Sequence, residues 1–162
     1  MANNEKLKVD ESLLPNLQLT GEKIVGVAFR RIIIEACKLT GEKIAEKILT
    51  GANYEEKLRN IEHYFKECGF GDLKIDEFSF EEKKAKIKLL NSIFPKYYAN
   101  TKSKGTVCYA IVGLLLGIFS KIFMTEVECK EVKCVANNDP NCEFILLTKG
   151  AINRLEDWIK NF

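Results

Sequence analysis

Three cysteines and several acidic residues are concentrated in the stretch ECKEVKCVANNDPNCEF, which covers residues 128–144. Thiolates and carboxylates are side chains with which proteins bind zinc, through Zn–S bonds of about 2.3 Å. The segment NNDPN has the composition of a tight turn. Symmetric pairing about Asn138 would place Cys134 opposite Cys142, and the β carbons of directly opposed residues lie about 4.5 to 5.5 Å apart. Two thiolates at that separation can share one tetrahedral ion.

The same residues leave a second interpretation open, because Cys-x7-Cys differs from the Cys-x2-Cys knuckle of ordinary zinc fingers. The chain has six cysteines, at positions 37, 68, 108, 129, 134 and 142. In a small secreted domain they would suggest disulfides, whereas a reducing compartment favours free thiols or metal ligation. Buried or oxidisable thiols therefore remain an alternative to a metal site. Cys37 and Cys68 are expected to be small buried residues on apolar helical faces.

The composition is that of one ordinary globular domain. Of the 162 residues, 46% are hydrophobic and 30% charged, with no second composition block. The 25 basic and 23 acidic residues are spread along the chain, so no basic stripe predicts direct binding to nucleic acid. The charges are mostly Lys and Glu and Gln18 is the single glutamine, a bias that weakly indicates a thermophile.

No segment of the sequence predicts export or membrane insertion. The N-terminal stretch MANNEKLKVDESLLP has no apolar signal region. The longest apolar run, at residues 107–119, is too short and too interrupted by glycine to span a bilayer. We therefore expect a cytoplasmic protein without a membrane span.

Hydrophobic spacing with both helical and strand periods predicts an α+β fold, in which helices pack on a small antiparallel sheet. Residues 1–16 form a polar arm, and residues 17–162 a single domain. The expected elements are, in order, a long helix over residues 24–49 that could break near Gly41, a helix ending at Gly69, a hairpin with strands around 73–77 and 85–89, a buried helix within 103–123, strands on either side of the NNDPN turn, and an amphipathic helix within 150–162.

Two segments together resemble the signature of the 4-vinyl reductase domain family. CYAIVGLLLGIF supplies a Cys before a Gly-containing apolar helix, and EVECKEVKCVANNDPNCEFIL supplies Glu-x2-Cys, an Asn-Asp-Pro turn and Cys-x-Phe. The match is strong over residues 105–147 and generic over the first two helices. The resemblance implies the fold of TRAPP vesicle-tethering subunits and of related ligand-binding sensor domains.

The resemblance also implies a set of metal ligands. In phenol-sensing transcription activators with this domain, one zinc is held by a Cys before the apolar helix, a Glu three residues before a second Cys, and a third Cys eight residues later. Those roles fall on Cys108, Glu131, Cys134 and Cys142. Four protein ligands imply a closed, structural zinc site. Cys129 is the alternative to Glu131, because it alternates onto the same side of the strand.

The family further implies that an apolar or aromatic small molecule binds in a pocket between helices and sheet. Candidate lining residues, which could equally be core, are Phe65, Phe94, Tyr98 and Tyr109. The phenol sensors grip the phenol hydroxyl with a His and a Trp. That pair is not expected here, because Trp158, the only Trp, follows the family signature. The only histidine, His63, is expected at a helix edge or surface.

The resemblance supports a small-molecule-binding or sensor module and leaves two alternatives. One is a 4-vinyl reductase or an accessory subunit of tetrapyrrole biosynthesis, although no G-x-G-x-x-G motif, Walker loop or open metal site supports catalysis. The other is an assembly scaffold like the TRAPP subunits, some of which carry an acyl group on a cysteine; Cys68 has no motif that demands one. A homodimer is expected, because the family commonly pairs through its helical face and the helix over residues 25–49 is apolar on more than one side.

Overall fold

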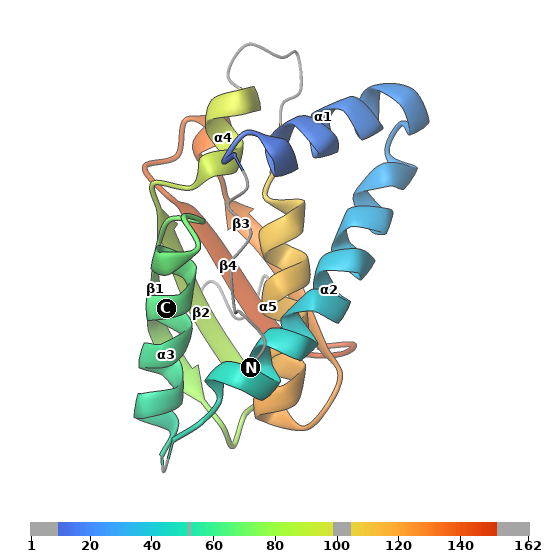
Figure 1. The fold of residues 1–162 in the computed structure, drawn as a ribbon. Helices are drawn as coiled ribbons and strands as arrows, with labels where there is room; N and C mark the ends of the chain where they lie inside the picture. The colour runs from blue at the N-terminus through green and yellow to red at the C-terminus, as the bar shows by residue number, and fades with distance from the viewer. Residues whose placement is uncertain (1–9, 52, 99–104, 152–162) are drawn as a thin grey trace, which may run out of the picture.

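The structure is a computed structural model that describes residues 10–51, 53–98 and 105–151 of the chain. It confirms the α+β class, with helices packed against one antiparallel sheet (Figure 1). The elements are, in order, α1 Leu13–Val25, α2 Ala28–Ile48, α3 Tyr54–Glu67, β1 Asp72–Ser79, β2 Lys84–Leu90, α4 Ile93–Tyr98, α5 Tyr109–Phe123, β3 Val127–Lys133, a single 3-10 turn Val135–Asn137, and β4 Cys142–Thr148.

The sheet consists of two hairpins joined side by side. Its strand order is β1-β2-β4-β3, and every neighbouring pair is antiparallel. The central strands β2 and β4 are therefore flanked by the edge strands β1 and β3. On β2 the buried residues alternate as Ala85, Ile87 and Leu89, as the strand period predicts.

Helix α5 lies against the inner face of the sheet, and α2 packs on α5 (Figure 1). Glycines allow the two helix backbones to approach closely. A β carbon added at Gly113 or Gly117 would collide with the α2 backbone at Ile34 or Lys38, and Gly41 of α2 makes the same approach to α5. Gly41 is thus a packing residue and does not break α2.

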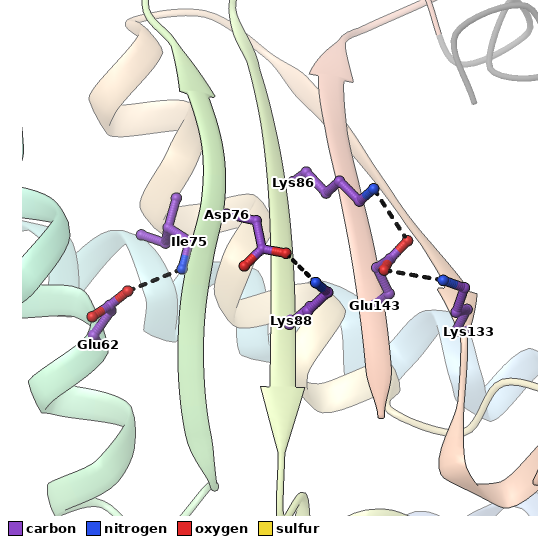
Figure 2. A network of polar contacts seen from close by, with 7 residues as sticks. All are labelled: Glu62, Ile75, Asp76, Lys86, Lys88, Lys133 and Glu143. Atoms are coloured by element: carbon purple, nitrogen blue, oxygen red, sulfur yellow. Dashed lines mark hydrogen bonds and ion pairs between the residues drawn. The ribbon is translucent and has the colours of Figure 1, made fainter. Parts of the chain in front are cut away.

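The outer face of the sheet carries cross-strand ion pairs (Figure 2). Lys88 Nζ lies 2.6 Å from Asp76 Oδ2. Glu143 on β4 is only 5% exposed, and it lies 3.8 Å from Lys86 Nζ and 3.3 Å from Lys133 Nζ. A buried carboxylate flanked by two ammonium groups is compensated, which explains how β4 tolerates it.

The N-terminal half differs from the prediction. α1 begins at Leu13, inside the predicted polar arm, and the helix predicted over residues 24–49 is two helices. They are separated at Gly26, whose φ of 74° ends α1 while its N–H donates to Glu22 O. α4 was not predicted, since six residues give no clear period. The helix predicted within residues 150–162 lies outside the described residues beyond Ala151.

Other predictions are confirmed. The predicted second helix is α3, and Asn53 caps it by accepting a hydrogen bond from Glu56 N at 2.9 Å. The predicted hairpin is β1–β2. Within the described part of the chain, no helix combines the length and apolar character needed to cross a bilayer.

Candidate metal centre

Four side chains from three parts of the fold meet at one end of the sheet. Cys108 is the residue before α5, Glu131 is on β3, Cys134 follows β3, and Cys142 begins β4. One ligand atom from each lies within 4.8 Å of the others. The three cysteines are fully buried and Glu131 is 7% exposed.

The register of the β3–β4 hairpin brings two of the cysteines together. Lys133 pairs with Glu143, so Cys134 and Cys142 come next in the same register, as the turn predicted. An irregularity between Glu131 and Lys133 changes the register by one residue. This bulge lets Glu131 and Cys134 both reach the cluster.

The sulfur separations suit a shared ion. Cys108 Sγ lies 3.5 Å from Cys142 Sγ, which lies 3.9 Å from Cys134 Sγ. A tetrahedral ion with metal–sulfur bonds of about 2.3 Å holds its sulfurs about 3.8 Å apart. The thiols are therefore close to the spacing that one metal ion requires.

Glu131 provides a separate test of whether the residues fit a metal. Its Oε2 accepts a hydrogen bond from Cys108 N at 3.0 Å, while its Oε1 is buried without a hydrogen-bond partner. An unsatisfied buried carboxylate oxygen is costly, and a bound cation would satisfy it. The donor set and this orphaned oxygen fit a metal ion.

The electrostatics of the cluster favour a cation. Burial, followed by the neighbouring Cys134 thiolate, raises the pKa of Glu131 to about 8. Hydrogen bonds from Cys108 and Cys142 hold the pKa of Cys134 well below its usual range, and donating to Cys134 raises the pKa of Cys108. The protein alone thus concentrates negative charge on one thiolate, whereas a divalent cation would stabilise all four groups in their ionised forms.

The NNDPN turn supports the cluster through its own side chains. Asp139 Oδ2 accepts from Cys134 N at 2.8 Å, and Asn138 adopts a positive φ of 68°. Asn137 Oδ1 accepts from Gly105 N at 2.7 Å and so ties the turn to the segment before α5. The composition of the turn predicted its position but not these two supporting contacts.

The other cysteines lie elsewhere. Cys129 is half-buried on β3 and is not one of the four clustered residues, although sequence left it as an alternative to Glu131. Cys37 is half-buried. Cys68 is exposed, which corrects the expectation of burial, because it is the C-cap of α3 rather than part of its apolar face.

The predicted pocket residues are all core residues in this structure. Phe65, Phe94, Tyr98 and Tyr109 are each at most 9% exposed. Three cavities bounded by described residues have other linings. His63 is exposed on α3, as expected.

A buried polar cluster lies beside two of these residues and was missed by sequence reasoning. Gln18 is fully buried; its Nε2 donates to Tyr98 Oη at 2.8 Å and to Val107 O at 2.7 Å, and its Oε1 has no partner. Nearby, Arg30 lies 5.0 Å from the Tyr109 ring centre. Burial raises the pKa of Tyr98 to about 12. The only available signal was that Gln18 is the single glutamine.

Comparison with known proteins bears on the whole arrangement. Residues 91–148 match the model of the 4-vinyl reductase domain. This range contains all four clustered residues, and the resemblance to the 4-vinyl reductase domain family is thereby confirmed. An uncharacterized protein of Methanocaldococcus jannaschii, MJ0745, is 27% identical over 123 residues, which are 72% of this chain and 64% of that protein. The chain thus aligns with less than two thirds of that relative's length.

Solved structures share the fold. The phenol-responsive sensory domain of the transcription activator PoxR, with phenol, has a TM-score of 0.77 at 13% identity and covers 93% of this chain and 82% of its own. A vinyl-4-reductase family protein of Methanocaldococcus jannaschii has a TM-score of 0.61 at 24% identity, covering 89% and 84%. A trafficking protein particle complex subunit 3 of Naegleria fowleri, covalently bound to palmitic acid, has a TM-score of 0.58 at 13% identity, covering 86% and 97%.

Proposed function

We propose that this protein is a cytoplasmic small-molecule-binding module in which a structural zinc ion fixes the β3–β4 hairpin to the start of α5. The buried cluster of three thiols and one carboxylate carries the zinc part of the proposal. Soft thiolates at tetrahedral separations select zinc over hard cations. Cys108, Glu131, Cys134 and Cys142 would fill the tetrahedral shell, so the ion would crosslink the fold without activating water.

The ligand part of the proposal rests on the match to the 4-vinyl reductase domain, on the fold shared with the PoxR sensory domain, and on the polar cluster at Gln18. We place an apolar or aromatic molecule with a hydroxyl group against Phe94, Tyr98 and Tyr109, with Phe65 on the far side of the core. The hydroxyl would donate to the orphaned Oε1 of Gln18, which removes the cost of leaving it unpaired. Since these aromatic side chains now pack the core, binding requires them to move apart.

The protein is proposed to act as a homodimer through α1 and α2. Apolar side chains on these helices are exposed to an extent unusual for a surface without a partner. They are Leu13, Leu17, Ile24, Val25, Val27, Ile32 and Leu39, each at least 50% exposed.

Metal analysis tests the zinc site. We expect about one zinc per chain in purified protein. Cys142→Ser should lower both the zinc content and the melting temperature, whereas Cys68→Ser, an exposed control, should change neither. Because a structural metal contributes folding free energy, stripping zinc from the wild type should lower its melting temperature toward that of Cys142→Ser. Less than about half an equivalent of zinc, together with a Cys134–Cys142 disulfide, would contradict the proposal.

Calorimetry tests the ligand site. We expect phenol to bind more tightly than toluene, because only phenol can donate to Gln18 Oε1. Gln18→Met has a similar volume but no acceptor, and it should weaken phenol binding by about tenfold while leaving toluene unchanged. The melting temperature of Gln18→Met must be measured alongside, since the substitution also removes the contacts with Tyr98 and Val107. Absence of heat with either probe would contradict this ligand class.

A further inference from the structure

A groove runs along the free edge of the sheet at β3. It has a volume of about 500 Å³ and lies between β3, α2 and α5. On the strand side it is lined by the consecutive residues 126–130, and Ile34, Val112 and Leu116 contribute apolar surface from the two helices. Five consecutive strand residues extend about 17 Å, which is the length of a typical short strand.

The backbone of β3 is open toward this groove. Lys149 N donates to Glu126 O at 3.1 Å, so Glu126 directs its backbone polar groups toward the β4 side. In an antiparallel pair these directions alternate, so Val127 and Cys129 direct theirs away from β4. No described residue forms a hydrogen bond with these outward groups of Val127 or Cys129. The edge therefore offers unpaired donors and acceptors in the spacing of a strand.

The opposite edge of the sheet is protected. On β1, Ile75 N donates to Glu62 Oε1 of α3 at 3.0 Å (Figure 2), and Lys74 Nζ lies 3.1 Å from the other oxygen of the same carboxylate. Natural proteins commonly cover sheet edges in this way, because an open edge pairs with other chains. The fold thus blocks one edge and leaves the other accessible beside a groove.

We propose that an extended peptide segment of a partner protein adds to β3 as a fifth strand in this groove. Its main chain would pair with Val127 and Cys129, as in other complexes formed by strand addition. Every second side chain of the peptide would then point toward Ile34, Val112 and Leu116, so these positions should be apolar.

The charge of the groove indicates the remaining side chains of the peptide. The lining contains one more cationic than acidic side chain, and Glu126 is already paired with Lys149 at 2.6 Å. On the α2 wall, Arg31 and Lys38 form no ion pair with a described residue, and the single carboxylate between them is Glu35. An extended segment that alternates apolar and acidic residues matches both the floor and this wall.

Blocked peptides of seven residues test the proposal on the full zinc-containing chain. The probe alternates valine and glutamate; one control has the same composition with its valines grouped, and another replaces glutamate with lysine. We expect the alternating acidic peptide to bind at least about tenfold more tightly than either control by fluorescence anisotropy. Arg31→Glu should weaken this binding by a similar factor, whereas Lys43→Glu, an exposed change on the same helix outside the groove, should not.

Hydrogen exchange distinguishes strand addition from other modes of binding. The amides of Val127 and Cys129 should exchange more slowly when the peptide is bound, because they become paired. Equal affinity for the three peptides, no binding up to millimolar concentration, or binding without this protection would overturn the proposal. Protection of the same amides that rises with protein concentration in the absence of peptide would assign the edge to a second copy of the chain and would also overturn it.

Discussion

The carboxylate of Glu131 separates a metal site from a cluster of packed thiols. Three buried cysteines alone would be compatible with reduced core residues. A buried carboxylate with one oxygen on Cys108 N and the other without a partner is costly in a purely apolar surrounding. Because the pKa of Glu131 is raised to about 8 by burial, a cation is needed to keep it ionised at neutral pH.

Glu131→Gln is therefore expected to weaken zinc binding by about tenfold to a hundredfold, because the amide keeps the volume and an oxygen but loses the charge. Competition with a chromophoric chelator measures the change. Glu128→Gln is the matched control, since it makes the same change on the same strand outside the cluster. Equal zinc affinity for the two variants would show that Glu131 is not a ligand.

Tyr98 makes the stability of the fold depend on alkaline pH. Burial raises its pKa from the ordinary value of about 10 to about 12. Between those values the unfolded chain releases the phenol proton while the folded protein retains it, so stability is complete below about pH 10 and falls as the pH rises toward about 12. Denaturant titrations should show this loss, with a contribution from Tyr98 of up to about 2 kcal/mol.

Tyr98→Phe is expected to reduce the slope of stability against pH in this range. At neutral pH the variant loses the hydrogen bond from Gln18, but that cost does not vary with pH. A slope identical to that of the wild type would assign the alkaline loss to other groups, of which Tyr64, also raised to about 12 by burial, is the first to test.

Sequence could place some of these residues and not others. Cys134 and Cys142 were predictable as neighbours, because a short turn separates them. Cys108 and Glu131 were assigned only through the family resemblance, since their contact depends on how α5 crosses the sheet. Gln18 was not predictable, because its partner Tyr98 is 80 residues away and local spacing carries no information about such contacts.

At the scale of elements, periodicity predicted those whose one face is clearly buried. The β1–β2 hairpin, α3 and α5 follow from their spacing. The division between α1 and α2 was missed because both flanks of Gly26 have apolar residues at helical spacing, including the exposed Ile24 and Val27. Whether those residues face a core is decided by tertiary packing, which the pattern alone does not contain.

The contact between α2 and α5 depends on Gly117. Alanine is favoured over glycine in a helix by about 1 kcal/mol, so Gly117→Ala should stabilise α5 if nothing opposed it. The added β carbon would instead meet the α2 backbone at Lys38 and Glu42. We expect a net loss of about 1 to 3 kcal/mol in the free energy of unfolding. Ser120→Ala, on the same helix, is the control and should have little effect; a stabilised Gly117→Ala would contradict the close packing.

At the scale of the whole molecule, the exposed apolar side chains of α1 and α2 are the feature that a monomer leaves unexplained. Ile24 and Val27 are 77% and 74% exposed and flank the junction of the two helices. A symmetric pair of chains can bury such a surface by placing the same patch on both sides of a two-fold axis. We therefore expect twice the 18.5 kDa chain mass by sedimentation at micromolar concentration.

Charge substitutions locate the expected dimer contact. Ile24→Glu should shift the protein toward monomer, because pairing would bury two unpaired carboxylates. Met124→Glu introduces the same charge at a side chain that is 78% exposed but lies at the end of α5, so it should leave the mass unchanged. Sedimentation of the wild type as a monomer throughout the micromolar range would remove the dimer. A dimer that survives Ile24→Glu but not Met124→Glu would move the contact from the α1–α2 surface to the end of α5.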